Sequence, residues 1–305
     1  MSTVVETVNL TKQFDDRVAV DNVSLSVPAG SIYGVVGANG AGKSTLLRLL
    51  LGVMWPSRGE VRLFGEVLPR EAAPLRQRVH YVGGDAEPFR SFRVHELIRY
   101  SSMLYERWDQ SRCTRLLEAL ELPTGRAIRN LSTGMKMQLR LAIALSTHPD
   151  LLILDEPTNG LDPVVKRQFL QLLVQEAASE GTTVVLATHL LDDVERIADG
   201  IAVMYQGRAI ASGVIDDLKD HVHRLQAALP TGLPPAIEDH PAVARVDRQG
   251  QVFTITVEGA GAVGIQERLW AAGATFVEPI GLELSDLFRY LMEKEGYTRD
   301  AVLLS

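Results

Sequence analysis

Residues suited to binding phosphate lie together at Gly37–Thr45, which reads GANGAGKST and matches the spacing G-x-x-x-x-G-K-[ST]. Glycines let the backbone turn so that successive N–H groups point at phosphate oxygens, and the following helix adds its positive N-terminal end. Lys43 supplies a full charge, and the Ser44 hydroxyl is a ligand for Mg²⁺. The alternative is a plain glycine-rich turn; the apolar run 32–36 before it and the helical leucine pattern after it favour a nucleotide. The nucleotide-binding residues are predicted as Gly37, Asn39, Gly40, Gly42, Lys43, Ser44 and Thr45.

A second group of candidate residues follows the wholly apolar run 151–154. Fully buried strands of parallel sheets have this composition. Asp155 at the carboxyl end of such a strand would lie beside the loop and hold Mg²⁺ through water. Glu156, one residue further, would orient or deprotonate the attacking water. Alone, Asp-Glu-Pro is more typical of a capped strand end, but together with Gly37–Thr45 it predicts nucleotide hydrolysis.

The elements that must position these residues follow from the apolar periodicity. Alternation at 4–10 and 18–27 predicts two antiparallel strands. The runs 151–155 and 183–187, separated by a helical pattern at 164–178, form a βαβ unit and predict a parallel sheet. Further strands are predicted at 60–64, 79–82 and 200–206, with a helical insert at 92–122.

The composition changes near residue 220, and Pro230–Pro235 marks a break. We therefore predict two domains, 1–220 and 221–305, the second a small α+β domain. Its predicted elements are a strand pair at 242–246 and 252–257, helices at 263–272 and 284–294, and a strand near 274–278.

The overall composition is that of an ordinary soluble globular protein. The 305 residues are 46% hydrophobic and 23% charged, and the net charge of −7 gives no sign of a nucleic-acid surface. The single Cys113 excludes an internal disulfide and fits a reducing cytoplasm. No apolar run approaches the ~20 residues that span a bilayer, and no secretory signal is visible. Any action at a membrane is expected to need spans from another chain.

Five elements in order resemble the ATP-binding cassette (ABC) family, over about the first 215 residues. Besides Gly37–Thr45, the segment Leu131–Gln138 (LSTGMKMQ) resembles the family's LSGGQ signature. Asp155–Asp162 (DEPTNGLD) resembles its Walker B glutamate and D-loop, and His189 resembles its switch histidine. Phe14 falls where the family keeps an aromatic that stacks on adenine; taken alone, it is equally well explained as an apolar side chain under a loop.

The resemblance implies an α/β fold: a P-loop NTPase core with an antiparallel β subdomain and a helical subdomain near 90–145. It also implies a head-to-tail dimer that encloses two ATP molecules. Each ATP would be held by one chain's phosphate loop and the other chain's Ser132 and Gly134. The family's roles then give the following residues: catalytic Lys43, Glu156 and His189; metal-binding Ser44 and Asp155; and nucleotide-binding Phe14, Ser132, Gly134 and Asp162.

Two departures from the family pattern are visible. The signature reads LSTGM, a variant associated with subunits of ABC-2 type exporters. The Q-loop glutamine expected after 79–82 is replaced by Gly84, which puts the coupling to a membrane partner in question. Asp85 either takes over the lost oxygen contact with Mg²⁺ or is a solvated turn residue, and the sequence favours neither.

The expected function is therefore an ATPase subunit of an ABC-2 type exporter. It would act as a homodimer or heterodimer, on the inner face of the membrane, through a separate permease subunit coupled near Phe89–Tyr105. Two alternatives are a non-transport cassette ATPase acting on nucleic acid or ribosomes, which the single cassette, the lack of a long coiled-coil insert and the acidic balance disfavour, and a regulatory ATP switch. Glu156 and His189 argue against the switch and the missing glutamine argues for it. A GTPase is disfavoured because no [NT]-K-x-D motif occurs.

Overall fold

The computed structural model describes residues 2–69, 75, 77–83, 89–259 and 261–296. The chain forms two compact units, 1–209 and 210–305. The division falls inside strand β10 (Arg208–Val214), whereas the sequence analysis places a domain boundary after residue 220. Each unit is built around its own apolar core, and no helix in the described ranges has the length and apolar composition to cross a bilayer.

The first unit begins with an antiparallel sheet, as the alternating pattern predicts. Strands β1 (Thr3–Phe14) and β2 (Arg17–Pro28) form a hairpin, and the sheet has the order β2-β1-β4-β5. Asp15 takes a positive φ of 46° in the two-residue turn, a conformation that Asp tolerates better than most residues. The turn places Phe14 directly opposite Arg17. The remaining strands are β4 (Arg58–Leu63) and β5 (Glu66–Val67).

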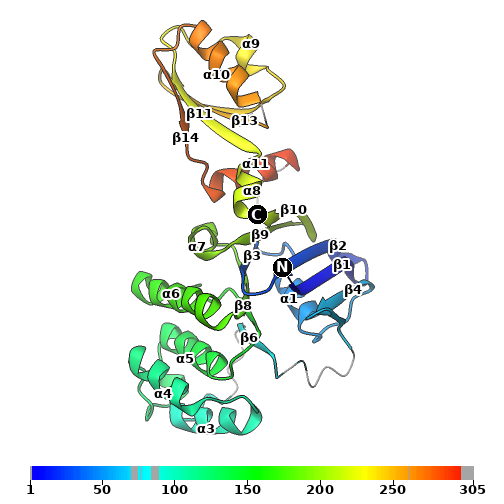
Figure 1. Ribbon diagram of the computed structural model, residues 1–305, viewed down its shortest axis with the longest axis vertical. Helices are drawn as coiled ribbons and strands as arrows, with labels where there is room; N and C mark the ends of the chain where they lie inside the picture. The colour runs from blue at the N-terminus through cyan, green and yellow to red at the C-terminus, as the bar shows by residue number, and fades with distance from the viewer. Residues whose placement is uncertain (1, 70–74, 76, 84–88, 260, 297–305) are drawn as a thin grey trace. The chain divides into compact units, whose positions relative to one another are not determined.

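A second sheet of six strands carries the phosphate loop. Its order is β10-β9-β3-β8-β7-β6, and the pairs β9–β3, β3–β8, β8–β7 and β7–β6 are all parallel. Helix α1 packs on one face, and helices α5, α6 and α7 pack on the other (Figure 1). The strands are β3 (Ile32–Val36), β6 (Val79–Gly83), β7 (Leu151–Asp155), β8 (Thr183–Thr188) and β9 (Gly200–Tyr205); the helices are α1 (Lys43–Leu50), α5 (Thr133–Leu145), α6 (Pro163–Glu180) and α7 (Leu191–Ile197).

Helix α1 lies between the two sheets of the first unit. It packs against β7 and β8 of the parallel sheet and against β2 and β4 of the antiparallel sheet. Its four buried leucines fill the space between them, so the helix that follows the phosphate loop is fixed from both sides. These leucines are Leu46, Leu47, Leu49 and Leu50.

The helical insert predicted at 92–122 is present, and it is divided into two helices. The structure has two helices, α3 (Val94–Leu104) and α4 (Gln110–Ala119). Tyr105 is extended (φ −111°, ψ 122°) and ends α3, and the Asp109 carboxylate accepts a hydrogen bond from Arg112 N (2.8 Å) to cap α4. A short 3₁₀ turn (Ile128–Asn130) then leads to the signature segment.

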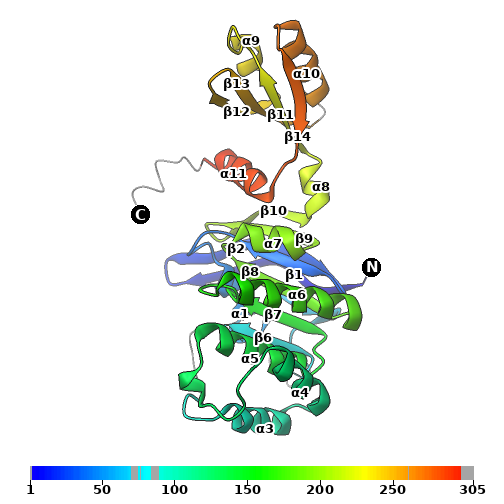
Figure 2. The ribbon, with the colours of Figure 1, turned by 90° about the vertical axis from the view of Figure 1, so that its left-hand side faces the viewer.

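The second unit is a four-stranded antiparallel sheet with the order β12-β13-β11-β14. With α9 and α10 against the sheet, the chain runs β-α-β-β-α-β, the ferredoxin-like arrangement (Figure 2). The predicted hairpin, the last strand and both helices are confirmed, whereas β11 and α9 are absent from the sequence analysis. The elements are α8 (Ile215–Lys219), β11 (Val222–Ala228), α9 (Pro235–Glu238), β12 (Val243–Gln249), β13 (Val252–Glu258), α10 (Gly261–Ala271), β14 (Phe276–Ile280) and α11 (Leu284–Lys294).

Candidate nucleotide-binding and hydrolysis site

The phosphate loop follows β3 and ends where α1 begins. Gly42 is the N-cap of α1 with φ of 103°, and a Cβ there would lie 2.4 Å from Ala19 O. A Cβ at Gly37 would lie 2.4 Å from Met204 O. Gly40 is free of such contacts but has φ of 82°. Gly37 and Gly42 are required because the loop backbone passes close to β9 and β2, and Gly40 is required because of its positive φ.

Lys43 projects back into the loop and is only 6% exposed. Its Nζ donates hydrogen bonds to the carbonyl oxygens of Gly37 (2.7 Å) and Ala38 (3.3 Å). The same ammonium lies 3.2 Å from Glu156 Oε1. One full positive charge is thus held at the mouth of the loop, facing the carboxylate that follows β7.

Ser44 and Asp155 meet at the start of α1 and the end of β7. The Ser44 hydroxyl donates a hydrogen bond to Asp155 Oδ1 (3.1 Å), and the Tyr81 hydroxyl donates to Oδ2 (3.5 Å). Burial, and then the charge of Asp155, raises the pKa of Tyr81, so its proton stays on the phenol oxygen. A hydroxyl and a carboxylate are the hard oxygen ligands that Mg²⁺ prefers.

A metal held here would need further ligands from outside the protein. Within the described ranges, no three His, Cys, Asp or Glu side chains gather in a way that could hold a metal ion. Mg²⁺ commonly binds through one or two protein oxygens, completing its shell with substrate phosphates and water. The pair Ser44 and Asp155 fits that mode of binding.

Glu156 and His189 form the second half of the site. Glu156 has a positive φ of 49°, and its N–H donates to Ala187 O (2.8 Å), which fixes its side chain against the end of β8. Its Oε2 accepts hydrogen bonds from Thr188 Oγ1 (3.3 Å) and His189 Nδ1 (2.8 Å). Nδ1 then carries the proton, which leaves Nε2 as an acceptor in the neutral ring. The residues predicted from two distant motifs therefore touch.

The other oxygen of Glu156 is buried without a hydrogen bond from any described residue. Oε1 lies within ion-pair distance of Lys43 Nζ, but not in the direction of a hydrogen bond. A buried carboxylate oxygen without a donor is costly, and a water molecule is a suitable donor. The geometry thus leaves one acceptor available beside the phosphate loop.

A cavity of about 450 Å³ extends from Lys43, Ser44 and Glu156 to the tip of the first hairpin. The predicted site residues Gly37, Asp155 and His189 are not among its lining residues. Phe14 lies on its wall with 42% of its surface exposed, and Lys12 Nζ is 5.1 Å from the centre of its ring. Arg17 also lines the cavity and was not identified from the sequence, although its position opposite Phe14 in a two-residue hairpin was a usable signal. The lining residues are Phe14, Arg17, Ala19, Asn39, Gly40, Gly42, Lys43, Ser44, Thr45 and Glu156.

Ser132, Gly134 and Asp162 are not among the residues that line this cavity. Ser132 is the N-cap of α5, and its hydroxyl oxygen accepts from Met135 N (3.2 Å). Asp162 is the N-cap of α6. Both side chains are exposed, so two helix N-termini face outward instead of toward the chain's own phosphate loop. The predicted Q-loop positions Gly84 and Asp85 lie outside the described residues.

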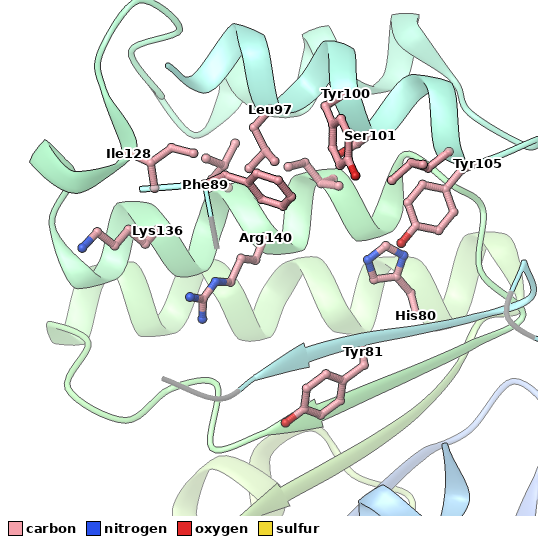
Figure 3. Close-up of a pocket in the computed structure, with 13 residues that line it drawn as sticks. His80, Tyr81, Phe89, Leu97, Tyr100, Ser101, Tyr105, Ile128, Lys136 and Arg140 are labelled. Carbon is pink, nitrogen blue, oxygen red and sulfur yellow. The ribbon is translucent and has the colours of Figure 1, made fainter. Parts of the chain in front are cut away.

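A second, smaller cavity of about 240 Å³ lies between β6, α3 and α5 (Figure 3). His80 stacks on Tyr105 with ring centres 5.1 Å apart, and burial lowers the pKa of His80 from 6.5 to about 4. Phe89 contacts Tyr100 at 5.0 Å between ring centres. We call this the aromatic pocket, defined by these four rings. Tyr81 points to the opposite side of β6 from His80 (Figure 3). Its hydroxyl reaches Asp155 Oδ2 at 3.5 Å.

Comparison with known proteins identifies the family. Residues 20–159 match the family model described as ABC transporter. The chain is 36% identical over 222 residues to the probable multidrug ABC transporter ATP-binding protein YbhF of Escherichia coli, covering 71% of this chain but only 38% of YbhF. It is 31% identical over 221 residues to the bacitracin transport ATP-binding protein BcrA of Bacillus licheniformis, covering 72% of each.

A solved ATP-binding subunit of an ABC transporter has the same cassette fold. It superposes with a TM-score of 0.64 and 28% identity, over 71% of this chain and 92% of that chain. The mixed α/β core with its antiparallel subdomain agrees with the fold predicted from the sequence. The chain belongs to the ATP-binding subunits of ABC transporters, a family whose members bind and hydrolyse ATP for transport.

Proposed function

We propose that this chain binds Mg-ATP in the 450 Å³ cavity and hydrolyses it with Glu156 and His189. The observation that carries the proposal is that Glu156, which follows β7, contacts both Lys43 at the start of α1 (3.2 Å) and His189 after β8 (2.8 Å). Phosphoryl transfer depends mainly on positioning and on stabilising charge, and these residues supply both.

Each residue has a distinct role in this proposal. Lys43 and the loop N–H groups hold the β- and γ-phosphates, and Ser44 and Asp155 hold Mg²⁺. Glu156 Oε1, which is ion-paired with Lys43 but has no hydrogen-bond donor among the described residues, accepts a proton of the attacking water and aims its oxygen at the γ-phosphate. Glu156 Oε2 holds His189 by its Nδ1–H, which fixes the ring beside the same phosphate. Phe14 stacks on the base, since every base offers a π-face.

The active form in this proposal is a head-to-tail dimer, either a homodimer or a heterodimer. The exposed N-termini of α5 and α6 support it, since Ser132 and Gly134 of one chain would meet the phosphates held by the other. Asp162, which accepts hydrogen bonds from Val164 N and Val165 N (3.1 Å each), would lie at the same joint.

We further propose that the dimer drives an ABC-2 type exporter through a separate permease, on the cytoplasmic face of the membrane. Two observations support this: the LSTGM signature, and the names of the relatives, which refer to multidrug and bacitracin transport. The aromatic pocket lies in the Phe89–Tyr105 region and is the proposed attachment for a cytoplasmic segment of the permease. Tyr81 joins β6 beside this pocket to Asp155.

Replacing Glu156 by Gln tests the catalytic role. The amide keeps the shape but removes the charge that aims the water, so the variant should bind ATP, accumulate as a closed dimer in Mg-ATP and hydrolyse at least about 100-fold more slowly. Gel filtration with Mg-ATP and a phosphate-release assay measure both effects. A variant that stays monomeric at high concentration, or hydrolyses at the wild-type rate, would contradict the proposal. Glu118→Gln, which removes a charge from the exposed face of α4, is the matched control.

A further inference from the structure

A buried carboxylate outside the proposed catalytic group lies close behind it. Asp193 is on α7 and is only 1% exposed. Its Oδ2 accepts a hydrogen bond from Thr158 Oγ1 (2.6 Å), and its Oδ1 lies 2.6 Å from Lys166 Nζ. Thr158 is 2% exposed, so the Asp193–Thr158 contact is shielded from solvent. None of the three residues lines the nucleotide cavity.

The three residues join the segments that carry the predicted site residues. Thr158 follows Glu156 by two positions in the segment that leads to Asp162. Lys166 lies in the first turn of α6, and its N–H donates to Asp162 O (2.9 Å). Asp193 lies in the helix that begins two residues after His189. One side chain thus holds the segment 157–162, the start of α6 and the helix after His189 in a single arrangement.

Stability alone is a poor explanation for this arrangement. Removing a carboxylate from water costs several kcal/mol, and well-packed apolar residues often stabilise a protein equally well or better. A buried charged group with fixed partners instead holds the segments that it joins in one defined geometry. A displacement of about 1 Å at a catalytic centre lowers the rate by up to about 100-fold, so a defined geometry is valuable at this place.

We propose that Asp193 is a positioning residue for hydrolysis, which sets His189 relative to the segment Thr158–Asp162 through its hydrogen bond with Thr158. The inference rests on the proposed function, because it assumes that His189 acts on the γ-phosphate and that Asp162 meets the second copy of the chain. When the partner chain of the dimer displaces the segment Thr158–Asp162, the hydrogen bond between Thr158 and Asp193 transmits the displacement to α7 and His189. Hydrolysis is thereby tied to closure of the dimer.

Two substitutions of Thr158 separate positioning from packing. Thr158→Val keeps the shape of the side chain but loses the donor to Asp193; Thr158→Ser keeps the donor but loses a methyl group. Positioning predicts that Thr158→Val lowers kcat about 10- to 100-fold and leaves KM for ATP within about twofold, while Thr158→Ser stays within about threefold of wild type. A packing role predicts the opposite order, because only Ser leaves a cavity.

A double-mutant cycle tests whether Asp193 is the other partner. Asp193→Asn should lower kcat to a similar extent, and adding Thr158→Val to it should cause less than about a twofold further loss. Asp192→Asn removes a charge at the exposed neighbouring position and is the matched control, with a wild-type rate expected. All rates are measured on the full chain in Mg-ATP, with Glu156→Gln as the inactive reference.

The outcomes separate the two proposals. The positioning role is overturned if Thr158→Val has the wild-type kcat, if Thr158→Ser is the slower variant, or if the losses in the cycle simply multiply. A rise in KM with unchanged kcat also overturns it. The proposed function fails on a different result, a wild-type rate for Glu156→Gln. Because the Val variant has the shape of the native side chain, the test does not depend on whether Asp193→Asn folds.

Discussion

The ring of His80 provides a prediction about stability that can be worked out in numbers. Burial lowers its pKa from 6.5 to about 4, and its Nδ1 lies 3.4 Å from Thr147 Oγ1. The folded state therefore binds the proton less tightly than the unfolded chain. The contribution of the neutral His80 ring to the free energy of unfolding is fully present above pH 6.5. It is lost progressively as the pH falls from 6.5 toward 4.

The size of the effect follows from proton linkage. Between about pH 7.5 and about pH 5.5 the unfolded chain takes up nearly one proton at this residue, and the folded protein takes up almost none. One pKa unit corresponds to about 1.4 kcal/mol, so the loss over this interval is about 1.3 kcal/mol. His80 is partly exposed toward the aromatic pocket, which makes this figure an upper bound.

Urea unfolding of wild type and His80→Asn at the two pH values measures the effect. Asn keeps a polar atom near the position of Nδ1 but does not titrate. A Trp270→Phe background leaves Trp55 and Trp108, both in the first unit, as the fluorescent reporters. We expect the loss of unfolding free energy between the two pH values to be about 1 kcal/mol smaller in His80→Asn. Equal losses in both proteins would refute the reasoning.

Four other outcomes are expected. Lys43→Ala should abolish detectable ATP binding in a fluorescent-nucleotide titration, because the loop loses its one full positive charge. Phe14→Ala should weaken binding of ATP about 10-fold and binding of inorganic triphosphate by less than about twofold, because only the base meets the ring. If Asp85 holds the metal, Asp85→Ala should raise the Mg²⁺ concentration needed for half-maximal hydrolysis several-fold and Gly84→Gln should lower it; an unchanged Mg²⁺ titration for Asp85→Ala assigns that residue to a solvated turn. A chain ending at residue 220 should still bind ATP, and loss of binding in a folded truncation would contradict the predicted independence of 221–305.

The parts of the fold that the sequence predicts well are those with one dominant local signal. The apolar run 151–155 is β7, and alternation defines both strands of the first hairpin. Glu156 and His189 were predicted from separate motifs, and they touch because the carboxyl ends of adjacent parallel strands meet at the same edge of the sheet.

The parts that were missed depend on tertiary contacts or on weak local patterns. β11 reads VHRLQAA, in which the alternation is imperfect: His223 falls on the same face as the buried Leu225 and Ala227, and the buried Val222 falls on the face of Arg224 and Gln226. The break between α3 and α4 depends on Asp109 as a cap, a residue type equally common in a helical solvent face. Tyr81 was an unremarked strand residue, and its contact with Asp155 requires knowing that β6 lies beside β7.

The tight packing at Gly42 has a further consequence, for the size of molecule that the site accepts. Ala19 belongs to the strand that begins opposite Phe14, and its carbonyl leaves no room for a Cβ on Gly42. Asp21 N–H also donates a hydrogen bond to Gly207 O (2.8 Å), and Gly207 N–H donates to Ala41 O (3.0 Å). Backbone hydrogen bonds through Gly207 therefore link the hairpin to the phosphate loop. The backbone that carries Phe14 is therefore held at a fixed distance from the phosphate loop. The site therefore selects its ligand by length: a molecule engages both ends only if its ring and its terminal phosphate have the matching separation.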